Sequence, residues 1–323
     1  MRRFGLSLAA LALLSACGGP PQGPTPPPVG ELSLACPINQ SVEVVGTNVT
    51  VDYPPPQPTG GAPPVTVVCT PASGTEFPLG QTSVNCTATD NAGRSAVCGF
   101  AVQVTQIPVI GATAFLAFGD SLTNGEVSLN AQVLVVDRTV AYPTVLAERL
   151  QARYKSQTIT VVNAGVSGES AEKGEDRLPD EIDRHHPEVL LLLQGVIDLT
   201  QHGEAGIQIV TDALRNDIRN ARAQGVEHIF LSTLLPQKPG SNSQAMPFIK
   251  EMNDVIEELA RRENVHLVDG YGAIAGHEAT LVGRDGLHLT PEGYEALAGA
   301  FFDAIVVALE TPPSAASRQR RRR

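Results

Sequence analysis

The sequence predicts an α/β domain built on a doubly wound parallel sheet, preceded by a smaller all-β sandwich. Between residues 111 and 310, apolar strand-like runs alternate with helical segments. This alternation is typical of a parallel sheet covered by helices on both faces, which makes three layers. Between residues 31 and 106, short alternating runs are separated by Pro, Gly and Asn at sandwich-like spacing. At 323 residues, the chain is long enough for two such domains.

The first residues are expected to be an export signal. Two arginines precede an apolar run over residues 6–14, which is too short to span a bilayer as a mature helix. The following sequence, Leu14-Ser15-Ala16-Cys17, resembles the bacterial lipobox. That resemblance implies that residues 1–16 are removed and that Cys17 is diacylated, which would anchor the protein to the membrane of the bacterial cell envelope. A plain secretory peptide with an incidental cysteine is the alternative.

A proline-rich segment follows the cysteine. Residues 18–30 hold six prolines in thirteen positions and cannot build a core, so residues 17–30 are expected to form an extended tether. At the other end, residues 311–323 finish in a run of arginines, for which a solvated, disordered tail is expected.

Charge and composition exclude some kinds of partner. The net charge is −11, and residues 112–310 hold 29 acidic against 15 basic side chains, a net charge of −14. An acidic body repels nucleic acid, so no nucleic-acid partner is expected. The chain has no Trp and only 4% aromatic residues, which argues against a stacking platform for bases or large carbohydrates.

Four cysteines lie in the predicted sandwich, at Cys36, Cys69, Cys86 and Cys98. An even number of cysteines in an exported chain indicates a disulfide framework. A zinc site is the alternative, but the spacings lack any short Cys-x-x-Cys arm. Residue patterns alone permit three pairings.

Four segments of this region resemble the HYR (hyalin repeat) module. They are Cys69-Thr70-Pro71-Ala72-Ser73-Gly74, Phe77-Pro78-Leu79-Gly80, Val84-Asn85-Cys86-Thr87-Ala88-Thr89-Asp90 and Cys98-Gly99-Phe100-Ala101-Val102. The resemblance implies an immunoglobulin-like sandwich over residues 31–106 and the disulfides Cys36–Cys98 and Cys69–Cys86. HYR modules are associated with adhesion and spacing, so chemistry is expected in the α/β domain.

The α/β domain has a recognisable order of elements. Its last helix is expected to open at Thr290-Pro291, with Thr as N-cap and Pro at the first helical position. Strands are expected at residues 114–118, 159–162, 189–193, 228–232 and 265–268, and further helices at residues 207–224 and 246–262.

Two short motifs at opposite ends of this domain indicate nucleophilic catalysis. Gly119-Asp120-Ser121-Leu122 follows the first strand, where a tight turn would expose Ser121. Asp285-Gly286-Leu287-His288 precedes the last helix, and a spacing of three lets the carboxylate fold back onto the imidazole. Either motif alone is compatible with an ordinary loop. Together they predict Ser121 as nucleophile, His288 as general base and Asp285 as the acid that orients the imidazole.

A third segment, Asn163-Ala164-Gly165-Val166-Ser167-Gly168-Glu169-Ser170, follows the second strand. A glycine such as Gly168 can bring its backbone N–H close to a substrate carbonyl. The three segments together resemble the SGNH/GDSL hydrolase superfamily over residues 112–308. Their local sequences are most similar to its arylesterase, thioesterase and lysophospholipase branch. The resemblance implies a flavodoxin-like sheet and an oxyanion hole formed by Ser121 and Gly168. It implies no metal and no cofactor.

One motif departs from the family pattern. The family has Gly-x-Asn-Asp, with an Asn side chain as third oxyanion donor, whereas this chain has Gln194-Gly195-Val196-Ile197-Asp198. Ile197 has no donor, and losing one such donor costs on the order of 10²–10³ in kcat. Gln194 is a candidate replacement donor.

The sequence therefore predicts hydrolysis of a carboxylic ester or thioester through an acyl-serine intermediate. Lipid, lysophospholipid, sugar-acetate and small esters all remain open as substrates, and residues 125–139 are expected to form one wall of the pocket. A non-catalytic binding or adhesion lipoprotein with a degenerate SGNH domain is the alternative, because of Ile197. Acyl transfer to an acceptor other than water would use the same residues.

Overall fold

The computed structural model describes residues 30–130 and 132–311, which form two compact units. The larger unit holds the chain from Val102 onward together with Ser41–Val51 and Glu76–Thr82. The smaller unit holds the described residues up to Gln40 together with Asp52–Thr75 and Ser83–Ala101. Cys17, the predicted signal peptide, the tether as far as residue 29 and the tail from residue 312 lie outside the described residues. Within residues 30–130 and 132–311, no helix has the length and apolar character needed to cross a membrane.

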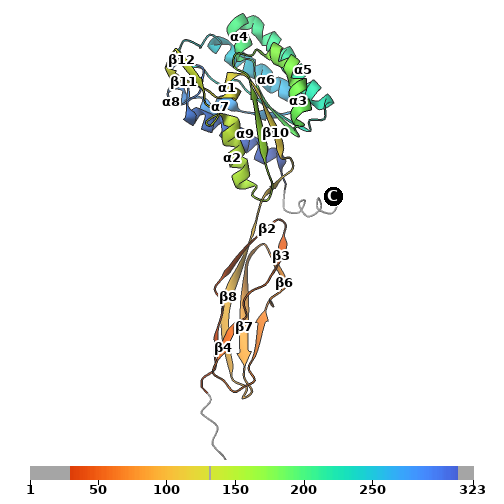
Figure 1. The fold of residues 1–323 in the computed structure, drawn as a ribbon, viewed down its shortest axis with the longest axis vertical. Coiled ribbons are helices and arrows are strands. Elements are labelled where there is room, and N and C mark those ends of the chain that lie inside the picture. Colours follow the sequence, from red (N-terminus) through yellow and green to blue (C-terminus); the bar gives the residue numbers. More distant parts are fainter. Residues whose placement is uncertain (1–29, 131, 312–323) are drawn as a thin grey trace, which may run out of the picture. The chain divides into compact units, whose positions relative to one another are not determined.

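The N-terminal region consists of β-strands (Figure 1). One sheet has the order β2-β8-β7-β5, and two strand pairs, β3-β6 and β1-β4, complete the region. Side chains alternate along β7, where Val84, Cys86 and Ala88 are buried and their neighbours exposed, as in a strand with one face on a core. The strands are β1 (Ser33–Ala35), β2 (Gln40–Val44), β3 (Asn48–Val51), β4 (Gln57–Thr59), β5 (Thr66–Thr70), β6 (Thr75–Pro78), β7 (Gly80–Thr89) and β8 (Ser95–Gln106).

Two disulfides connect this region, Cys36–Cys98 and Cys69–Cys86. They are the pairs that the HYR resemblance implies. Cys69 and Cys86 stand directly opposite each other on the antiparallel strands β5 and β7, so their disulfide ties two neighbouring strands. The region has few large buried side chains, and Phe77, Tyr53 and Phe100 are the aromatic residues of its core. Covalent cross-links supplement a core of that size.

The α/β part is organised around a five-stranded sheet with the order β13-β10-β14-β15-β16. Every pair of neighbours in it is parallel, and in chain order the strands run 2-1-3-4-5, the flavodoxin-like arrangement. The first strand therefore lies between the second and the third, and the winding of the chain reverses beside it. Its strands are β10 (Ala114–Gly119), β13 (Thr160–Gly165), β14 (Val189–Leu193), β15 (His228–Ser232) and β16 (His266–Val268).

Helices cover the sheet in two layers (Figure 1). Helices α3, α5 and α6 pack together in one layer, and α2, α7 and α9 in the other. In the second layer, Tyr142 of α2 stacks on Phe301 of α9 with 4.8 Å between ring centroids. The helices are α1 (Ser121–Asn124), α2 (Tyr142–Arg153), α3 (Ala171–His185), α4 (Val196–His202), α5 (Gly206–Ala223), α6 (Ile249–Glu263), α7 (Gly270–Ile274), α8 (Glu278–Leu281) and α9 (Pro291–Leu309), with 3₁₀ turns η1 (Gly203–Ala205) and η2 (Met246–Phe248).

The predicted three-layer α/β fold and strand-rich N-terminal region are confirmed. The continuous apolar run in β14 is buried on both faces, as expected for a central parallel strand. Helix α9 begins as predicted, because the Thr290 side chain accepts a hydrogen bond from the N–H of Gly293 and Pro291 occupies the first helical position.

Three features of the α/β part go beyond the sequence prediction. Helix α3 continues through Pro179, which lies in its middle. A β-hairpin, β11 (Glu126–Asn130) and β12 (Val133–Val136), occupies the segment that was expected only to shape a wall. Two short strands, β9 (Val109–Ile110) and β17 (Glu310–Thr311), pair with each other at the ends of the α/β part.

We expect the disulfides to stabilise the strand-rich region alone. Replacing Cys69 and Cys86 together by Ser should lower that region's free energy of unfolding by about 2–5 kcal/mol, because the open chain regains loop entropy. Residues 111–310 contain no cysteine, so their thermal transition should not move. Differential scanning calorimetry of the wild type with and without reductant provides the control. A parallel shift of the α/β transition would contradict the prediction.

Candidate active site

The candidate nucleophile stands on a tight turn after the central strand β10. Asp120 is the N-cap of the four-residue helix α1, and its side chain accepts a hydrogen bond of 2.9 Å from the N–H of Leu122. Ser121 is the first residue of α1, so no preceding turn of helix accepts its N–H. Gly119 permits this turn, since a Cβ there would lie 2.1 Å from the carbonyl oxygen of Leu193.

Ser121, His288 and Asp285 form a continuous hydrogen-bonded chain. Ser121 Oγ lies 2.9 Å from His288 Nε2, and His288 Nδ1 lies 2.6 Å from Asp285 Oδ2. All three residues are buried, and Asp285 is completely inaccessible. The structure thus brings together residues that are 167 positions apart in sequence, in the arrangement that a serine nucleophile and its base require.

Asp285 is itself held by neighbouring loops. Asn242 donates from its side chain to Asp285 Oδ2 at 3.0 Å, and its N–H donates to the Asp285 carbonyl at 2.8 Å. On the other side, the N–H of Asp285 donates to Ser128 Oγ at 3.3 Å. Burial by itself raises the pKa of Asp285, but the hydrogen bonds from His288 and Asn242 outweigh it, so the pKa lies below its usual range. The carboxylate therefore stays ionised and can hold the imidazole.

The pKa of Asp120, directly before Ser121, shifts in the opposite direction from that of Asp285. Burial, only partly offset by the hydrogen bond from Leu122, raises its pKa from 3.8 to about 7. The folded state thus retains a proton on Asp120 that the unfolded chain releases. This contribution makes the folded protein less stable as pH rises from about 4 to about 7. Negative charge beneath the nucleophile is therefore disfavoured.

Gly168 lies in the turn between β13 and α3, with a φ of +74° that favours glycine. An ideal Cβ on it would meet no atom within 4 Å, so it faces open space. Among the hydrogen bonds of residues 30–130 and 132–311, none is donated by the N–H of Ser121 or of Gly168. Both N–H groups therefore remain available to a ligand.

The turn that carries Gly168 is fixed by a buried polar cluster. Arg177 of α3 binds both carboxylate oxygens of Glu169, at 2.8 and 2.6 Å, and its guanidinium lies over the ring of Phe118. Gln194 donates its side-chain amide to Glu169 at 3.3 Å and to the Ser170 carbonyl at 3.1 Å. Gln194 is thus committed to the turn and does not line the cavity at Ser121, which overturns the expectation that it replaces the missing donor.

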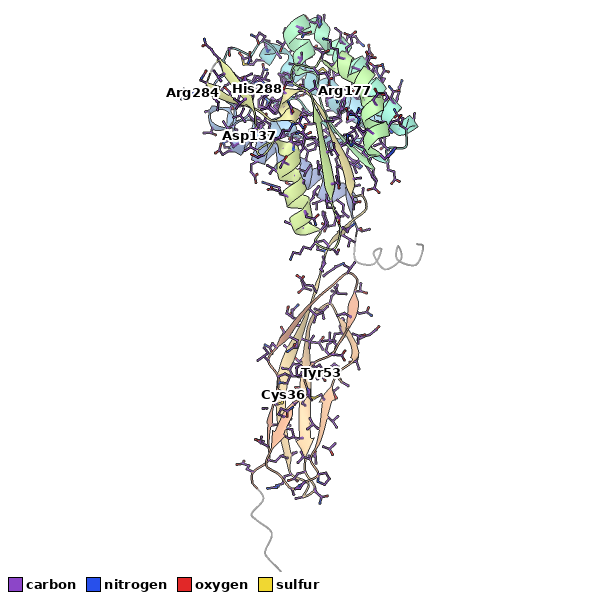
Figure 2. All side chains as sticks on the ribbon, in the orientation of Figure 1. Cys36, Tyr53, Asp137, Arg177, Arg284 and His288 are labelled. Atoms are coloured by element: carbon purple, nitrogen blue, oxygen red, sulfur yellow. A yellow bond between two sulfur atoms is a disulfide. The ribbon has the colours of Figure 1, made fainter. Side chains whose placement is uncertain are left out.

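A cavity of about 180 Å³ opens at Ser121 and His288. Ile197, at the start of α4, lies in its wall, as its place in the family pattern requires. Residues 125–139 contribute Glu126, as expected for one wall. The complete lining is Ser121, Glu126, Gly168, Ile197, Thr200, Asn242, Gln244, Leu287 and His288. In Figure 2, His288 lies at the end of the α/β part where Figure 1 places α1 and the β11–β12 hairpin.

Sequence reasoning missed two residues of this site. Glu126 Oε2 lies 3.0 Å from His288 Nε2, the nitrogen that also faces Ser121. Asn242 supports Asp285 from a loop with no recognisable motif. Neither position carries a signal in a single sequence, because each is set by the path of a loop. No group of three or more His, Cys, Asp or Glu with the geometry of a metal site occurs among the residues that the structure describes.

Models of known protein families match both parts of the chain. The model of the GDSL-like lipase/acylhydrolase family matches residues 117–296, more than half of the chain. The chain belongs to this family. The HYR domain model matches residues 24–104. The GDSL-like part is therefore an ester-hydrolysing enzyme, joined to an HYR domain.

Individual relatives are distant. An arylesterase from Vibrio mimicus is 25% identical over 179 residues, which cover 55% of this chain and 80% of that protein. The crystal structure of an acetylxylan esterase from Geobacillus stearothermophilus has a TM-score of 0.50 and 23% identity, covering 61% of this chain and 95% of that one. The aryl esterase of M. smegmatis has a TM-score of 0.53 and 19% identity, covering 61% and 99%. At these identities the two structures support the fold of the GDSL-like part.

Ile197 is the position at which this GDSL-like enzyme departs from the family pattern, and substitution there is informative. If Ser121 and Gly168 are the only oxyanion donors, Ile197→Asn should raise kcat and kcat/KM together, by up to about 10²-fold, with KM nearly unchanged. Loss of apolar contact should cost about 1–3 kcal/mol of stability. Steady-state kinetics and thermal unfolding measure the two effects separately.

Ile197→Leu is the matched control, because leucine has the shape of asparagine without its donor. A rate gain in both variants would assign the effect to pocket shape. No gain in folded Ile197→Asn would show that the oxyanion is fully served by other groups.

Proposed function

We propose that the GDSL-like part hydrolyses small carboxylic esters or thioesters through an acyl intermediate on Ser121. The observation that carries the proposal is the chain of hydrogen bonds from Ser121 Oγ to His288 and on to Asp285, at 2.9 and 2.6 Å. A buried serine at hydrogen-bond distance from an oriented imidazole has the arrangement of an activated nucleophile. No separate structural need explains why these three side chains meet at one cavity.

The proposed reaction begins when Ser121 Oγ attacks the carbonyl carbon and His288 Nε2 takes its proton. Asp285 accepts the hydrogen bond from Nδ1–H and stabilises the imidazolium. The N–H groups of Ser121 and Gly168 donate to the oxyanion as the tetrahedral intermediate forms. His288 then protonates the leaving alcohol or thiol, which leaves an acyl group on Ser121. Water, deprotonated by His288, hydrolyses that acyl-serine and regenerates the site.

The size of the cavity favours a small acyl group. About 180 Å³ is close to the roughly 150 Å³ of a cavity that holds benzene, and below the range of pockets for drug-sized ligands. Among the classes left open by the sequence, small and sugar-linked acetyl esters fit better than long-chain lipids. Relatives named as an arylesterase and an acetylxylan esterase agree with a small acyl group.

We place this activity at the bacterial cell envelope. The lipobox-like sequence ending at Cys17 and the proline-rich tether support a lipid-anchored protein whose catalytic part is held away from the membrane. The HYR domain fits the same role, since disulfide-bonded modules persist in oxidising compartments outside the cytosol.

Labelling with a fluorophosphonate probe tests the nucleophile. The wild type should be modified at Ser121, and Ser121→Ala should lose both labelling and hydrolysis of a short-chain aryl ester by at least 10³-fold. Asp285→Asn should reduce kcat heavily while the protein remains folded, because the imidazole tautomer is no longer held. Ser156→Ala, an exposed serine on the same part, is the control. An unlabelled, inactive wild type would favour the alternative of a binding or adhesion lipoprotein.

The anchor has its own test. Mass spectrometry of the membrane fraction should detect a diacylglyceryl peptide that begins at Cys17, and Cys17→Ser should move the protein into the soluble fraction. Cleavage at another residue, or an unmodified Cys17 in membrane-bound protein, would contradict the lipoprotein assignment.

A further inference from the structure

Glu126 places a carboxylate inside the catalytic cavity. Its Oε2 lies 3.0 Å from His288 Nε2, and its side chain is 17% exposed. The same cavity exposes Ser121, so a substrate that reaches the nucleophile passes close to this negative charge. Neither the hydrogen-bonded triad nor the two backbone donors of the proposed mechanism needs Glu126.

The position of Glu126 is set by the fold. Gly125, at a φ of +94°, ends helix α1 in the left-handed conformation, and a Cβ there would lie 2.6 Å from that of Ala141. The hydroxyl of Tyr294, a buried residue of α9, donates to the Glu126 carbonyl at 2.6 Å. Glu126 also pairs with Val136 at the base of the hairpin. Its backbone is therefore held from three sides, unlike that of a surface glutamate in a loose loop.

No lysine or arginine side chain offsets this charge among the described residues that line the cavity. Of the described residues that line it, none is Lys or Arg, and the walls other than Glu126 and His288 are neutral. Two arginines of the same part are bound elsewhere: Arg138 binds the side chain of Asn124, and Arg177 binds Glu169. A second carboxylate, that of Asp285, lies buried beneath the site and stays ionised. The field at the cavity is thus negative, and low solvent exposure weakens its screening.

We propose that Glu126 determines the charge specificity of the esterase. Its carboxylate disfavours esters that carry an anionic group close to the scissile bond and favours neutral or cationic ones. This inference rests on the proposed hydrolysis at Ser121. It narrows the substrate class to acyl esters of uncharged or positively charged alcohols, and it disfavours esters whose phosphate or carboxylate lies beside the ester.

Three aryl acetates with the same acyl group test the proposal: 4-acetoxybenzoate as the anion, its methyl ester as the neutral analogue, and 3-acetoxy-N,N,N-trimethylanilinium as the cation. The wild type should prefer the neutral and cationic esters in kcat/KM. In Glu126→Gln, the ratio of neutral to anionic kcat/KM should fall by about tenfold, the effect of one partly screened charge several ångströms away. The preference for the cation should fall in the same variant.

Two control variants separate charge from structure. Glu148→Gln removes one exposed charge from α2 at a residue that does not line the cavity, and should keep the wild-type ratios. Glu126→Asp retains the charge and should keep most of the discrimination. Raising the salt concentration should lower the ratio of neutral to anionic kcat/KM in the wild type and leave this ratio nearly constant in Glu126→Gln.

The outcomes are distinct. Turnover of the neutral acetate by the wild type tests the proposed hydrolysis, and the ratios test Glu126. Unchanged ratios in folded Glu126→Gln would overturn the charge-specificity proposal while leaving hydrolysis intact. An equal loss on all three esters would also overturn it, because Glu126 would then act on His288 and not on the substrate. A thermal midpoint for each variant establishes that it is folded.

Discussion

The candidate active site depends on the reversal of winding beside strand β10. Because β13 and β14 flank β10 on opposite sides, the loops that follow these three strands diverge around one point at the carboxyl end of the sheet. Ser121 follows β10, Gly168 follows β13 and Ile197 follows β14. Parallel register is what makes three separate segments of chain neighbours there. With another strand order, the chain would still contain the same motifs, but their residues would not lie together at one site.

Asp285 and His288 come from the loop before α9, and hydrogen bonds from neighbouring loops hold this loop in place. Asp285 and His288 lie between the last short helices and α9, in a stretch without regular structure. Order is supplied instead by Asn242, Ser128 and the backbone of residues 238–242, all of which contact Asp285 or Gly286. The triad therefore combines Ser121 at the carboxyl end of the sheet with Asp285 and His288 in a loop that polar contacts hold in place. Such buried polar contacts are costly when incomplete, so they specify one arrangement.

Much of this arrangement could be predicted from the sequence, and the reasons for success and failure differ. Strand β14 is an uninterrupted apolar run, and α9 opens with Thr290-Pro291, so local chemistry determined both. Ser121, Asp285 and His288 stand in short motifs whose spacing already limits their geometry. Glu126 and Asn242 are different, because their side chains reach the site only through the course of a hairpin and a loop. Gln194 shows the same limit. Its neighbours in sequence suggest a place in the cavity, whereas packing against α3 directs its amide to Glu169 and Ser170.

The glycines of the site show which parts of the cavity tolerate substitution. The floor does not tolerate added side-chain atoms, whereas the walls do. A methyl group at Gly119 would collide with the backbone of β14, and one at Gly165 would lie 2.2 Å from the backbone nitrogen of Asn124. The floor of the site is thus built from backbones in direct contact, and altering any of these glycines displaces the nucleophile turn. The walls consist of side chains, among them Ile197, Thr200 and Leu287, which can be exchanged without moving a strand. Substrate preference can therefore diverge between related enzymes while the reacting groups stay in place. Substitutions that alter the specificity of this pocket are best made at the side chains of its walls.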